Sequence, residues 1–386
     1  MEYAAQLISP HNGRPLRPAS AHLLTDGELL WPVVDGIAYL RPKHDLRKQV
    51  VAALWLENVA VARRLLLADQ DRFSPTAPPD QAALDELLDP QNTHSLREAM
   101  RLLQYGPVGD YFAYRWCTPT FLSGLTLLGQ MAELQQPVVE FACGIGHFLR
   151  ALEQRDIRTV GVDIVFSKLW LARRYMEVEG PLVCGDIEAG PVLSTDQART
   201  VFCHDAFYFF EQKEAAIRHM RAVAGAGNLA VGHVHTHLDA HEAGFSASLE
   251  AYHRLTDSTL HDDTDAVRQW YAGGHTLAEA RPDSPAIGWV EGRTNSTRID
   301  WSAGAARLRL NPLLDTTDLR YPSEGWRREY EADHTGLEAY QLGKLLRRNP
   351  LVRALCEGHL VPEELETADR RALYRQRVLV DLPARW

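Results

Sequence analysis

The sequence lacks the cysteine pattern of a metal-binding or disulfide-stabilised protein. Its five cysteines are scattered along the chain, and none forms a CxxC pair. The first residues, MEYAAQLISPHNG, do not contain the basic segment and following apolar segment of a secretory signal. We therefore expect a cytoplasmic location, no disulfide framework and no structural zinc site built from thiolates.

Long apolar runs and an excess of basic residues are also missing. No segment approaches the roughly 18 uninterrupted apolar residues of a membrane-spanning helix. The formal net charge is −10, so the chain as a whole does not attract the phosphate backbone of a nucleic acid. We expect neither a membrane nor a nucleic acid as a partner. The composition, with 45% hydrophobic and 24% charged residues, is that of an ordinary folded globular protein.

Four segments are predicted from changes of pattern along the chain. Hydrophobic runs separated by Asp-Gly turn signals predict a small β module at residues 1–45. Apolar residues at helical spacing, interrupted by FSPTAPPD, predict a helical lid segment at residues 46–110. Alternating strand-like and helix-like segments predict an α/β core with an insertion at residues 111–311. Helical patterns predict a C-terminal helical extension at residues 312–386.

The expected fold of the core is a Rossmann-like, doubly wound α/β sheet. Because helices separate the predicted strands, the strands should run parallel and be joined by right-handed crossovers. AIGWVEG and ARLRLNPLL, at residues 286–292 and 306–314, are expected to complete the edge of this sheet. The core strands are expected near residues 138–143, 158–164, 181–186, 199–205 and 228–236.

The stretch VVEFACGIGHFLRAL, at residues 138–152, predicts a buried strand, a turn and the start of a helix. Its glycines permit positive φ and the close approach of a ligand. A dinucleotide fingerprint needs a third small residue at position 149, and the bulky Leu149 opposes it. By itself the turn also fits a plain connection between a strand and a helix. The pattern that remains is an acidic residue followed by small residues at steps of two: Glu140, Ala142, Gly144 and Gly146.

This pattern resembles motif I of the class I S-adenosylmethionine-dependent methyltransferases, with alanine in place of the first glycine. Three later strand ends carry acidic residues in the order found in that family, and the resemblance covers roughly residues 110–240. It implies S-adenosylmethionine as the cofactor. The matching positions are Asp163 with its neighbour Ile164, Asp186 with Ile187, and Asp205.

The resemblance also implies roles for these residues. The loop from Glu140 to Gly146 would lie under the methionine and ribose of the cofactor. Asp163 would accept the two ribose hydroxyls, and Ile164 is assigned to the cofactor site with it. Asp186 and Ile187 would meet the adenine, and Asp205 would lie beside the methyl-donating centre.

A helix ahead of the first core strand, in GDYFAYRWCTPTFL, is expected to pack over the cofactor. Arg115, together with Tyr111, is placed by sequence to meet the carboxylate of the methionine portion, because a guanidinium offers a planar fork that matches a carboxylate. The alternative is an aromatic helix buried against the sheet, with Arg115 at its rim.

The first 45 residues resemble the Trm112-like zinc-ribbon module that precedes some methyltransferase domains. LISPHNGRPL and LLWPVVDGIAYLRP carry this resemblance, but Ser9 and Asn12 stand at the CxxC-like places. We predict a degenerate module without zinc, which serves as a β scaffold for docking or self-association. A homodimer is the assembly that we consider.

A histidine cluster, GHVHTHLDAHEAG, places His233, His235 and His237 at alternate positions, with His241 just beyond. Three interpretations stay open: a divalent metal site, a catalytic or substrate-contacting role for His235 or His237, and histidines satisfied within the sheet. Neutral imidazole can remove a proton near pH 7, which favours the catalytic role. We assign His233 to the sheet and predict no bound metal. The predicted catalytic residues are His237, His235, Asp205 and Tyr208.

The predicted function is S-adenosylmethionine-dependent methyl transfer to a small-molecule acceptor in specialised biosynthesis. The aromatic and charged residues of the added segments indicate a small polar or amphipathic metabolite rather than a polymer. One alternative uses the same cofactor to attack another sulfonium carbon, for example by cyclisation to azetidine-2-carboxylate with release of methylthioadenosine. Another is a catalytically silent scaffold.

Overall fold

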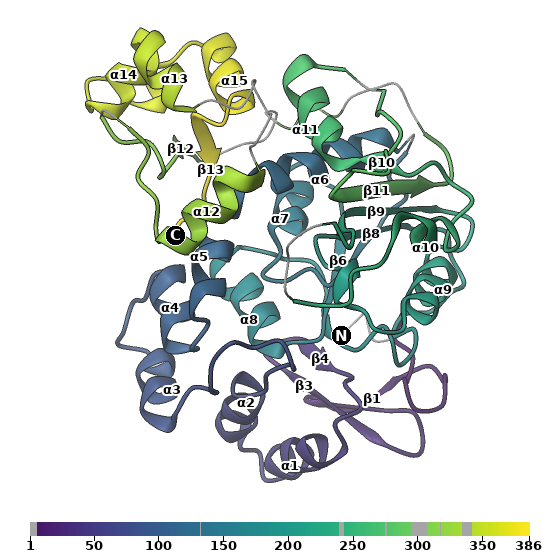
Figure 1. The fold of residues 1–386 in the computed structure, drawn as a ribbon. Coiled ribbons are helices and arrows are strands. Elements are labelled where there is room, and N and C mark those ends of the chain that lie inside the picture. The colour runs from purple at the N-terminus through teal and green to yellow at the C-terminus, as the bar shows by residue number, and fades with distance from the viewer. Residues whose placement is uncertain are drawn as a thin grey trace.

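A large mixed sheet forms the centre of the protein, and helices pack on both of its faces (Figure 1). The computed structural model describes residues 6–131, 133–238, 243–274, 276–294, 299, 301, 307–316, 318–333 and 342–386. The sheet has 11 strands in the order β1-β2-β3-β4-β7-β6-β5-β8-β9-β11-β10. The strands of this sheet are β1 (Arg17–Ser20), β2 (Leu23–Thr25), β3 (Leu30–Val34), β4 (Ile37–Tyr39), β5 (Val138–Phe141), β6 (Thr159–Asp163), β7 (Leu182–Cys184), β8 (Thr200–His204), β9 (Asn228–His235), β10 (His261–Asp262) and β11 (Ala286–Glu291).

The α/β fold class predicted from the sequence is confirmed. Strands β7, β6, β5, β8 and β9 run parallel to their neighbours, whereas β11 pairs antiparallel with β9. The strand order reverses at β5, where the chain passes from β7 back to β8 on the other side. At such a reversal the crossover helices leave on opposite faces, so the carboxyl ends of β5 and β8 open a crevice for a ligand.

Both faces of the parallel strands are buried, which explains why these strands are continuous apolar runs. Along β5, Val138 packs into the hydrophobic cluster on one face and Val139 into the cluster on the other. Helices α7 (His147–Glu153) and α8 (Phe166–Tyr175) contribute to the first cluster, and α9 (Lys213–Ala224) to the second.

The N-terminal strands belong to the main sheet. Strand β4 pairs in parallel with β7, with Ile37 opposite Leu182. The segment predicted as a separate β module therefore extends the central sheet at one end. Ser9, at a CxxC-like place, donates a hydrogen bond from Oγ to Oδ2 of the buried Asp26 at 2.5 Å. The likeness of this segment to a Trm112-like module stays a prediction.

Helices between the N-terminal strands and the core cover the face that carries α8. Side chains cap several of them: Asn58 accepts from Val61 N, and Ser95 forms a capping box with Glu98. None of the helices among the described residues has the length and apolar character needed to cross a membrane. The remaining helices up to residue 272 are α1 (His44–Trp55), α2 (Val59–Leu67), α3 (Gln81–Leu88), α4 (Leu96–Leu102), α5 (Pro107–Tyr114), α6 (Pro119–Gln130), α10 (Leu249–His253) and α11 (Asp263–Ala272).

The C-terminal segment differs from the prediction. Strand β12 (Leu308–Leu310) was expected at the edge of the main sheet, but it pairs antiparallel with β13 (Leu379–Asp381) in a separate two-stranded sheet. The buried ion pair of Arg150 Nη2 with Asp381 Oδ1, at 2.7 Å, ties β13 to α7. The pairing crosses the predicted boundary at residue 312. The C-terminal helices are α12 (Glu324–Asp333), α13 (Leu342–Arg348), α14 (Pro350–Cys356) and α15 (Thr367–Arg375).

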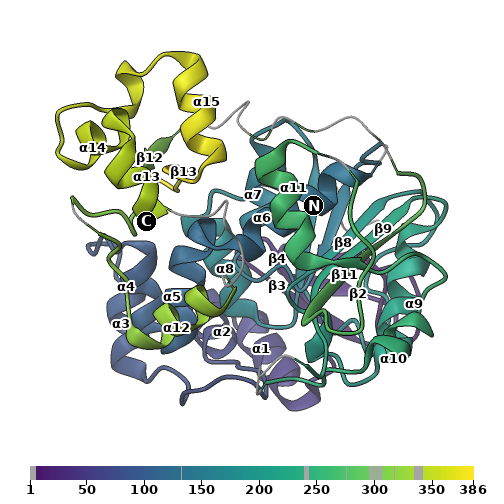
Figure 2. The same ribbon diagram turned by 45° about the horizontal axis from the view of Figure 1, so that its top comes forward.

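Helix α12 lies apart from α13, α14 and α15 and beside α5 (Figure 2). There Trp326 packs edge-on against Tyr114 of α5, with ring centroids 5.8 Å apart. The contact brings the C-terminal segment over the carboxyl ends of the core strands.

Candidate active site

A cavity of about 1760 Å³ lies over the carboxyl ends of strands β5 to β9. Helix α5, residues 70–75 and α12 contribute to its walls. Of the predicted site residues, Gly146 and His237 do not line it. The predicted residues that it brings together are Tyr111, Arg115, Glu140, Ala142, Gly144, Asp163, Ile164, Asp186, Ile187, Asp205, Tyr208 and His235.

The glycine turn after β5 is held in a left-handed conformation. Ala142, Gly144 and Gly146 have φ of 54°, 57° and 84°. Only glycine adopts this region without a steric penalty, so Ala142 is strained where the motif has glycine. A Cβ added to Gly144 would approach Phe112 Cε1 at 3.0 Å, which explains why the turn needs glycine at this position.

Asp163, at the end of β6, fixes the position of this turn. Its Oδ2 accepts from Gly144 N and its Oδ1 from Val165 N, each at 2.9 Å. Lys168 Nζ lies 3.9 Å from Asp163 Oδ1 and 3.8 Å from Asp71 Oδ2. Burial opposes the charge of Lys168, but these carboxylates raise its pKa above the ordinary value. Asp163 therefore already has a structural role, and its oxygens also line the cavity.

Glu140 has a buried side-chain oxygen that accepts no hydrogen bond from the described residues. Its side chain is buried, and Oε2 has no hydrogen-bond partner among the described residues. Burial raises the pKa of this carboxyl to about 8. A buried carboxyl that lacks a partner and lines a cavity suits a ligand with a hydrogen-bond donor or a positive charge.

The end of β7 contributes a mixed polar and apolar surface. Asp186 is half-buried, and its Oδ1 accepts from Glu188 N at 3.0 Å. Ile187 is buried and Ile164 half-buried on the same cavity wall. An apolar side chain beside a carboxylate suits an adenine ring, which has flat apolar faces and a donating amino group.

Asp205, directly after β8, is the centre of a buried polar network. Its Oδ2 accepts from Arg115 Nη1 and from Tyr111 Oη, each at 2.6 Å, and its Oδ1 accepts from Tyr208 Oη at 3.1 Å. Burial opposes its ionisation, yet His233 and Arg115 hold its pKa below the ordinary value. Arg115 was predicted to meet the methionine carboxylate of the cofactor, and in this structure its guanidinium is engaged with Asp205.

His204 completes the network as a neutral imidazole. Its Nδ1 accepts from Arg115 Nη2 at 3.2 Å, so its Nε2 carries the proton and donates to Ser123 Oγ at 3.1 Å. Burial, and then the charge of Arg115, lower its pKa to about 3. His204 therefore positions Arg115 without carrying a charge of its own.

His233 lies at an irregularity of β9. The register with β11 shifts between Ile287 and Trp289, and His233 has φ of 45° there. A bulge of this kind turns a side chain away from its regular direction. Its Nδ1 contacts Asp263 Oδ2 at 2.7 Å, and its Nε2 lies 3.9 Å from Asp205 Oδ1. His233, which was assigned to the sheet, thus connects Asp205 in the wall of the cavity with Asp263 of α11.

His235 lies next to this pair, whereas His237 does not. The His235 ring meets those of His233 and Tyr208 edge-on, at centroid distances of 4.9 Å and 4.4 Å. Strand β9 ends at His235, so the alternation that would have turned His237 to the same face ends as well. His237 is exposed, and His241 lies outside the described residues.

The sequence interpretation missed Asp263 and Ser123, and it assigned no function to His233. Asp263 is the first residue of α11, and the side chain of Asp262 caps that helix by accepting from Asp265 N. This capping pattern could have indicated the start of the helix. Its contact with His233, 30 residues away in the sequence, depends on the packing of α11 beside β9 and left no local signal.

Comparison with known proteins identifies the central part of the chain. Residues 138–227 match the sequence profile of a family described as a methyltransferase domain. This range includes Glu140, Asp163, Asp186 and Asp205, the acidic positions at the strand ends. No curated protein matches the chain. The matched domain is that of an enzyme that transfers methyl groups.

Solved structures of methyltransferases are similar to part of the chain. A TehB-like S-adenosylmethionine-dependent methyltransferase from Corynebacterium glutamicum is 15% identical over 44% of this chain and 87% of its own, with a TM-score of 0.34. A possible histamine N-methyltransferase from Thermotoga maritima is 14% identical over 48% and 92%, with a TM-score of 0.34. Phosphoethanolamine N-methyltransferase 2 from Haemonchus contortus, in complex with phosphomonomethylethanolamine and S-adenosylhomocysteine, is 18% identical over 46% and 49%, with a TM-score of 0.34.

Proposed function

We propose that this chain, which carries a methyltransferase domain over residues 138–227, transfers the methyl group of S-adenosylmethionine to a small-molecule acceptor in the same cavity. The observation that carries the proposal is the continuity of that cavity. It joins the glycine turn and the carboxylates of β5 to β7 with the polar cluster around Asp205, His233 and His235. A group-transfer enzyme needs this adjacency of a cofactor side and an acceptor side.

The size of the cavity supports two ligands. Pockets for one drug-sized ligand measure about 300–1000 Å³. The cavity here, at about 1760 Å³, has room for the cofactor and a second small molecule. The acceptor side is lined in part by aromatic rings, including Phe73 and Phe209 with centroids 4.9 Å apart, which suits a metabolite with an apolar portion.

The cofactor side fits S-adenosylmethionine. The unpartnered Oε2 of Glu140 offers an acceptor for the ammonium group or a hydroxyl, and Gly144 in the left-handed turn lines the same cavity. Asp163 would hold the ribose, and Asp186 with Ile187 would hold the adenine. Ile164 would pack on the adenine from the β6 side.

The bound cofactor supplies a methyl carbon that its sulfonium makes electrophilic. The chain's own task is to orient the acceptor toward that carbon and to exclude water. Asp205 and Tyr208 would orient the acceptor by hydrogen bonds, with Asp205 itself fixed by Arg115. The proton of an acceptor hydroxyl or amine would leave toward the cluster of His233 and His235. His237, which is exposed and outside the cavity, has no part in this proposal.

Calorimetry tests the cofactor side. S-adenosylhomocysteine should bind with one site per chain, and Asp163→Ala should weaken it at least tenfold. Asp45→Ala, whose side chain is 94% exposed on α1, is the matched control and should bind as the wild type does. Unchanged affinity in Asp163→Ala would remove the ribose assignment, and the absence of binding in the wild type would favour a silent scaffold.

Product analysis tests the reaction. The enzyme is incubated with S-adenosylmethionine and fractions of a metabolite extract, and the product nucleoside is identified by mass spectrometry. Acceptor-dependent formation of S-adenosylhomocysteine supports methyl transfer. Formation of methylthioadenosine instead would show attack on another sulfonium carbon and would overturn it.

A further inference from the structure

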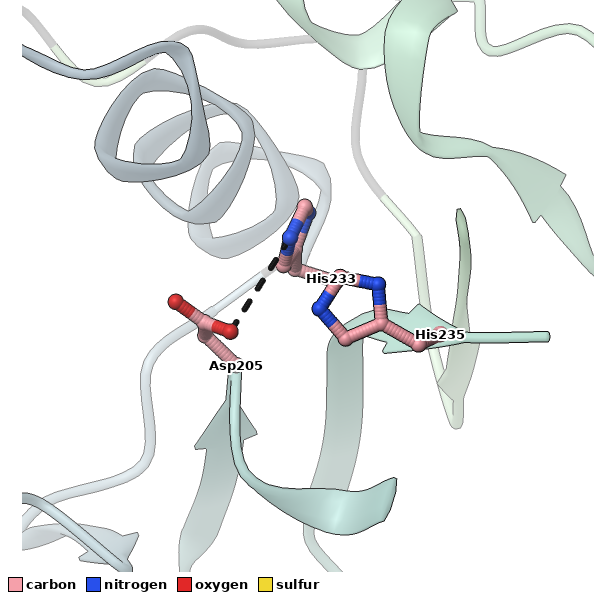
Figure 3. A group of neighbouring side chains, drawn as sticks. All are labelled: Asp205, His233 and His235. Atoms are coloured by element: carbon pink, nitrogen blue, oxygen red, sulfur yellow. Dashed lines mark ion pairs between the residues drawn. The ribbon is translucent and has the colours of Figure 1, made fainter. Parts of the chain in front are cut away.

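Asp205, His233 and His235 form a compact cluster of metal-ligating groups at the acceptor side of the cavity. One ligand atom from each residue lies within 4.8 Å of the other two. Figure 3 shows Asp205 at the end of its strand, with both imidazoles from the neighbouring strand beside it. Both histidines are buried, and all three residues line the cavity. The cluster is thus packed against the core on one side and faces the cavity on the other.

The contact with Asp263 determines which ring nitrogen of His233 points toward Asp205. Because Asp263 accepts from Nδ1 at 2.7 Å, that nitrogen carries the proton, and a neutral ring has its lone pair on Nε2. This lone pair faces Asp205 Oδ1 at 3.9 Å, beyond hydrogen-bond distance. A cation between these two atoms, either a second proton on the ring or a metal ion, would interact favourably with both.

The local charge also favours a cation. The side chains of Asp205 and Asp263 are only 7% and 11% exposed, and both carboxyl groups face His233. Arg115 is the guanidinium paired with Asp205, and His204 beside it is neutral. Arg115 offsets one of these two carboxylates, and a positive charge on the His233 ring or on a bound metal ion would offset the other.

In two of the ligands, the atom that would not bind the metal is held by a hydrogen bond to a neighbouring residue, as is usual for metal ligands. Asp263 holds the Nδ1 side of His233 and so directs Nε2 toward the cluster. Arg115 and Tyr111 occupy Oδ2 of Asp205, while Oδ1 accepts only from Tyr208 among the hydrogen bonds of the described residues. That oxygen keeps a lone pair on the side of His233.

We propose that Asp205, His233 and His235 bind one divalent cation of the zinc class, with an open coordination position toward the cavity. Two imidazoles and one carboxylate favour Zn²⁺ and similar transition metals over Mg²⁺ or Ca²⁺. Tetrahedral zinc with bonds of about 2.1 Å separates its ligand atoms by roughly 3.4 Å. In the cluster His233 Nε2 lies 3.9 Å from Asp205 Oδ1, and the ligand atoms lie within 4.8 Å of one another, so the side chains must move closer together to bind the ion. The site revises the sequence-based expectation that the chain holds no metal.

The cation would also specify the acceptor class. This step rests on the proposed function. An alcohol or phenol oxygen at the open position would lose its proton more readily, because the cation stabilises the oxyanion that remains. With both imidazoles bound to the cation, that proton would leave to solvent instead of to His233 or His235. The site therefore favours an oxygen acceptor that can reach a metal ion, in preference to a carbon acceptor.

Metal titration tests the site without reference to activity. The untagged chain of 386 residues is freed of metal by a chelator, and Zn²⁺ alone is titrated by calorimetry, with Co²⁺ absorption as a second readout. We expect one equivalent to bind, and each of His233→Ala and His235→Ala to weaken binding at least a hundredfold. His359→Ala, with a side chain 74% exposed and outside the cavity, is the matched control and should bind as the wild type does.

A conservative variant covers the case in which the alanine variants do not fold. Asp263→Asn keeps the volume of the residue behind His233 and should weaken Zn²⁺ about 10–100-fold, as substitutions behind a metal ligand do. If the wild type and Asp263→Asn bind Zn²⁺ equally, or the wild type binds none, the cluster is instead an imidazolium between two carboxylates. S-adenosylhomocysteine titrated into the same samples separates this outcome from failure of the proposed function, which would abolish nucleoside binding.

Discussion

Arg115 and Asp205 form a buried ion pair in the wall of the cavity, with Nη1 and Oδ2 2.6 Å apart and side chains 5% and 7% exposed. Arg115 begins the 3₁₀ turn after α5, and Asp205 follows β8, so the pair joins the covering helix to the sheet. Both residues were predicted from the sequence to belong to the site. Arg115 was expected to bind the methionine carboxylate of the cofactor, and Asp205 to lie beside the methyl-donating centre. The structure shows that they neutralise each other before any ligand binds.

Arg115→Ala should destabilise the protein by about 3–5 kcal/mol, because it leaves the carboxylate of Asp205 buried without its cation. Chemical denaturation measures the effect as a lower midpoint. The double variant Arg115→Ala/Asp205→Ala should lose less stability than the sum of the single variants. A midpoint of Arg115→Ala equal to that of the wild type would show that other groups solvate Asp205.

Ala142→Gly should stabilise the protein by about 1 kcal/mol. Ala142 has φ of 54°, a conformation that costs a non-glycine residue about 1–2 kcal/mol, and the greater flexibility of unfolded glycine offsets part of the gain. Thermal and chemical denaturation both measure the change. Ala151→Gly in the middle of α7 is the matched control and should destabilise instead. A loss of stability in Ala142→Gly would mean that the turn relaxes at no cost.

Glu140 should make the stability of the protein fall as the pH rises from about 4.5 to about 8. The folded chain keeps the proton of this carboxyl up to its pKa of about 8, whereas the unfolded chain releases it near the ordinary value of 4.5. The folded state therefore binds more protons across this range, and the free energy of unfolding decreases by at most about 1.4 kcal/mol per pH unit from this group.

Glu140→Gln isolates this contribution, because glutamine keeps the shape of the protonated side chain and does not titrate. As the pH rises, the unfolding free energy of the wild type should decrease relative to that of Glu140→Gln. Glu133→Gln, an exposed position just ahead of β5, should show no such shift. Parallel pH profiles of the wild type and Glu140→Gln would contradict a raised pKa in the folded state.

The sequence predicted the part of the site that depends on strand ends. Buried parallel strands are continuous apolar runs, so their ends are visible in the sequence, and the residues that follow them meet at one edge of the sheet. Asp163, Asp186 and Asp205 follow such strand ends, the resemblance to methyltransferases assigned them to the site, and all three line the cavity. The α/β class followed from the same alternation of strands and helices.

The remaining features depend on contacts that leave no periodic signal. The bulge at His233 breaks the alternation of β9, and the strand ends before His237, so spacing alone favoured the wrong histidine for the cavity wall. Strand β12 has an ordinary strand pattern, and only its pairing with β13, about 70 residues later, excludes it from the main sheet. The pairing of β4 with β7, in which Ile37 lies opposite Leu182, joins residues still farther apart in the sequence.

His235 and His237 give the last prediction, because they are two residues apart and differ in surroundings. His235 is buried beside His233 and Tyr208, whereas His237 is exposed outside the cavity. His235→Ala should lower the rate of acceptor-dependent S-adenosylhomocysteine formation by about 100-fold or more, since a positioned proton acceptor or metal ligand contributes on the order of 10²–10⁴. His237→Ala should change it less than twofold. Both variants should bind S-adenosylhomocysteine as the wild type does, because neither residue lies on the cofactor side. A large loss in His237→Ala with full activity in His235→Ala would reverse the assignment and require the segment after β9 to fold over the acceptor.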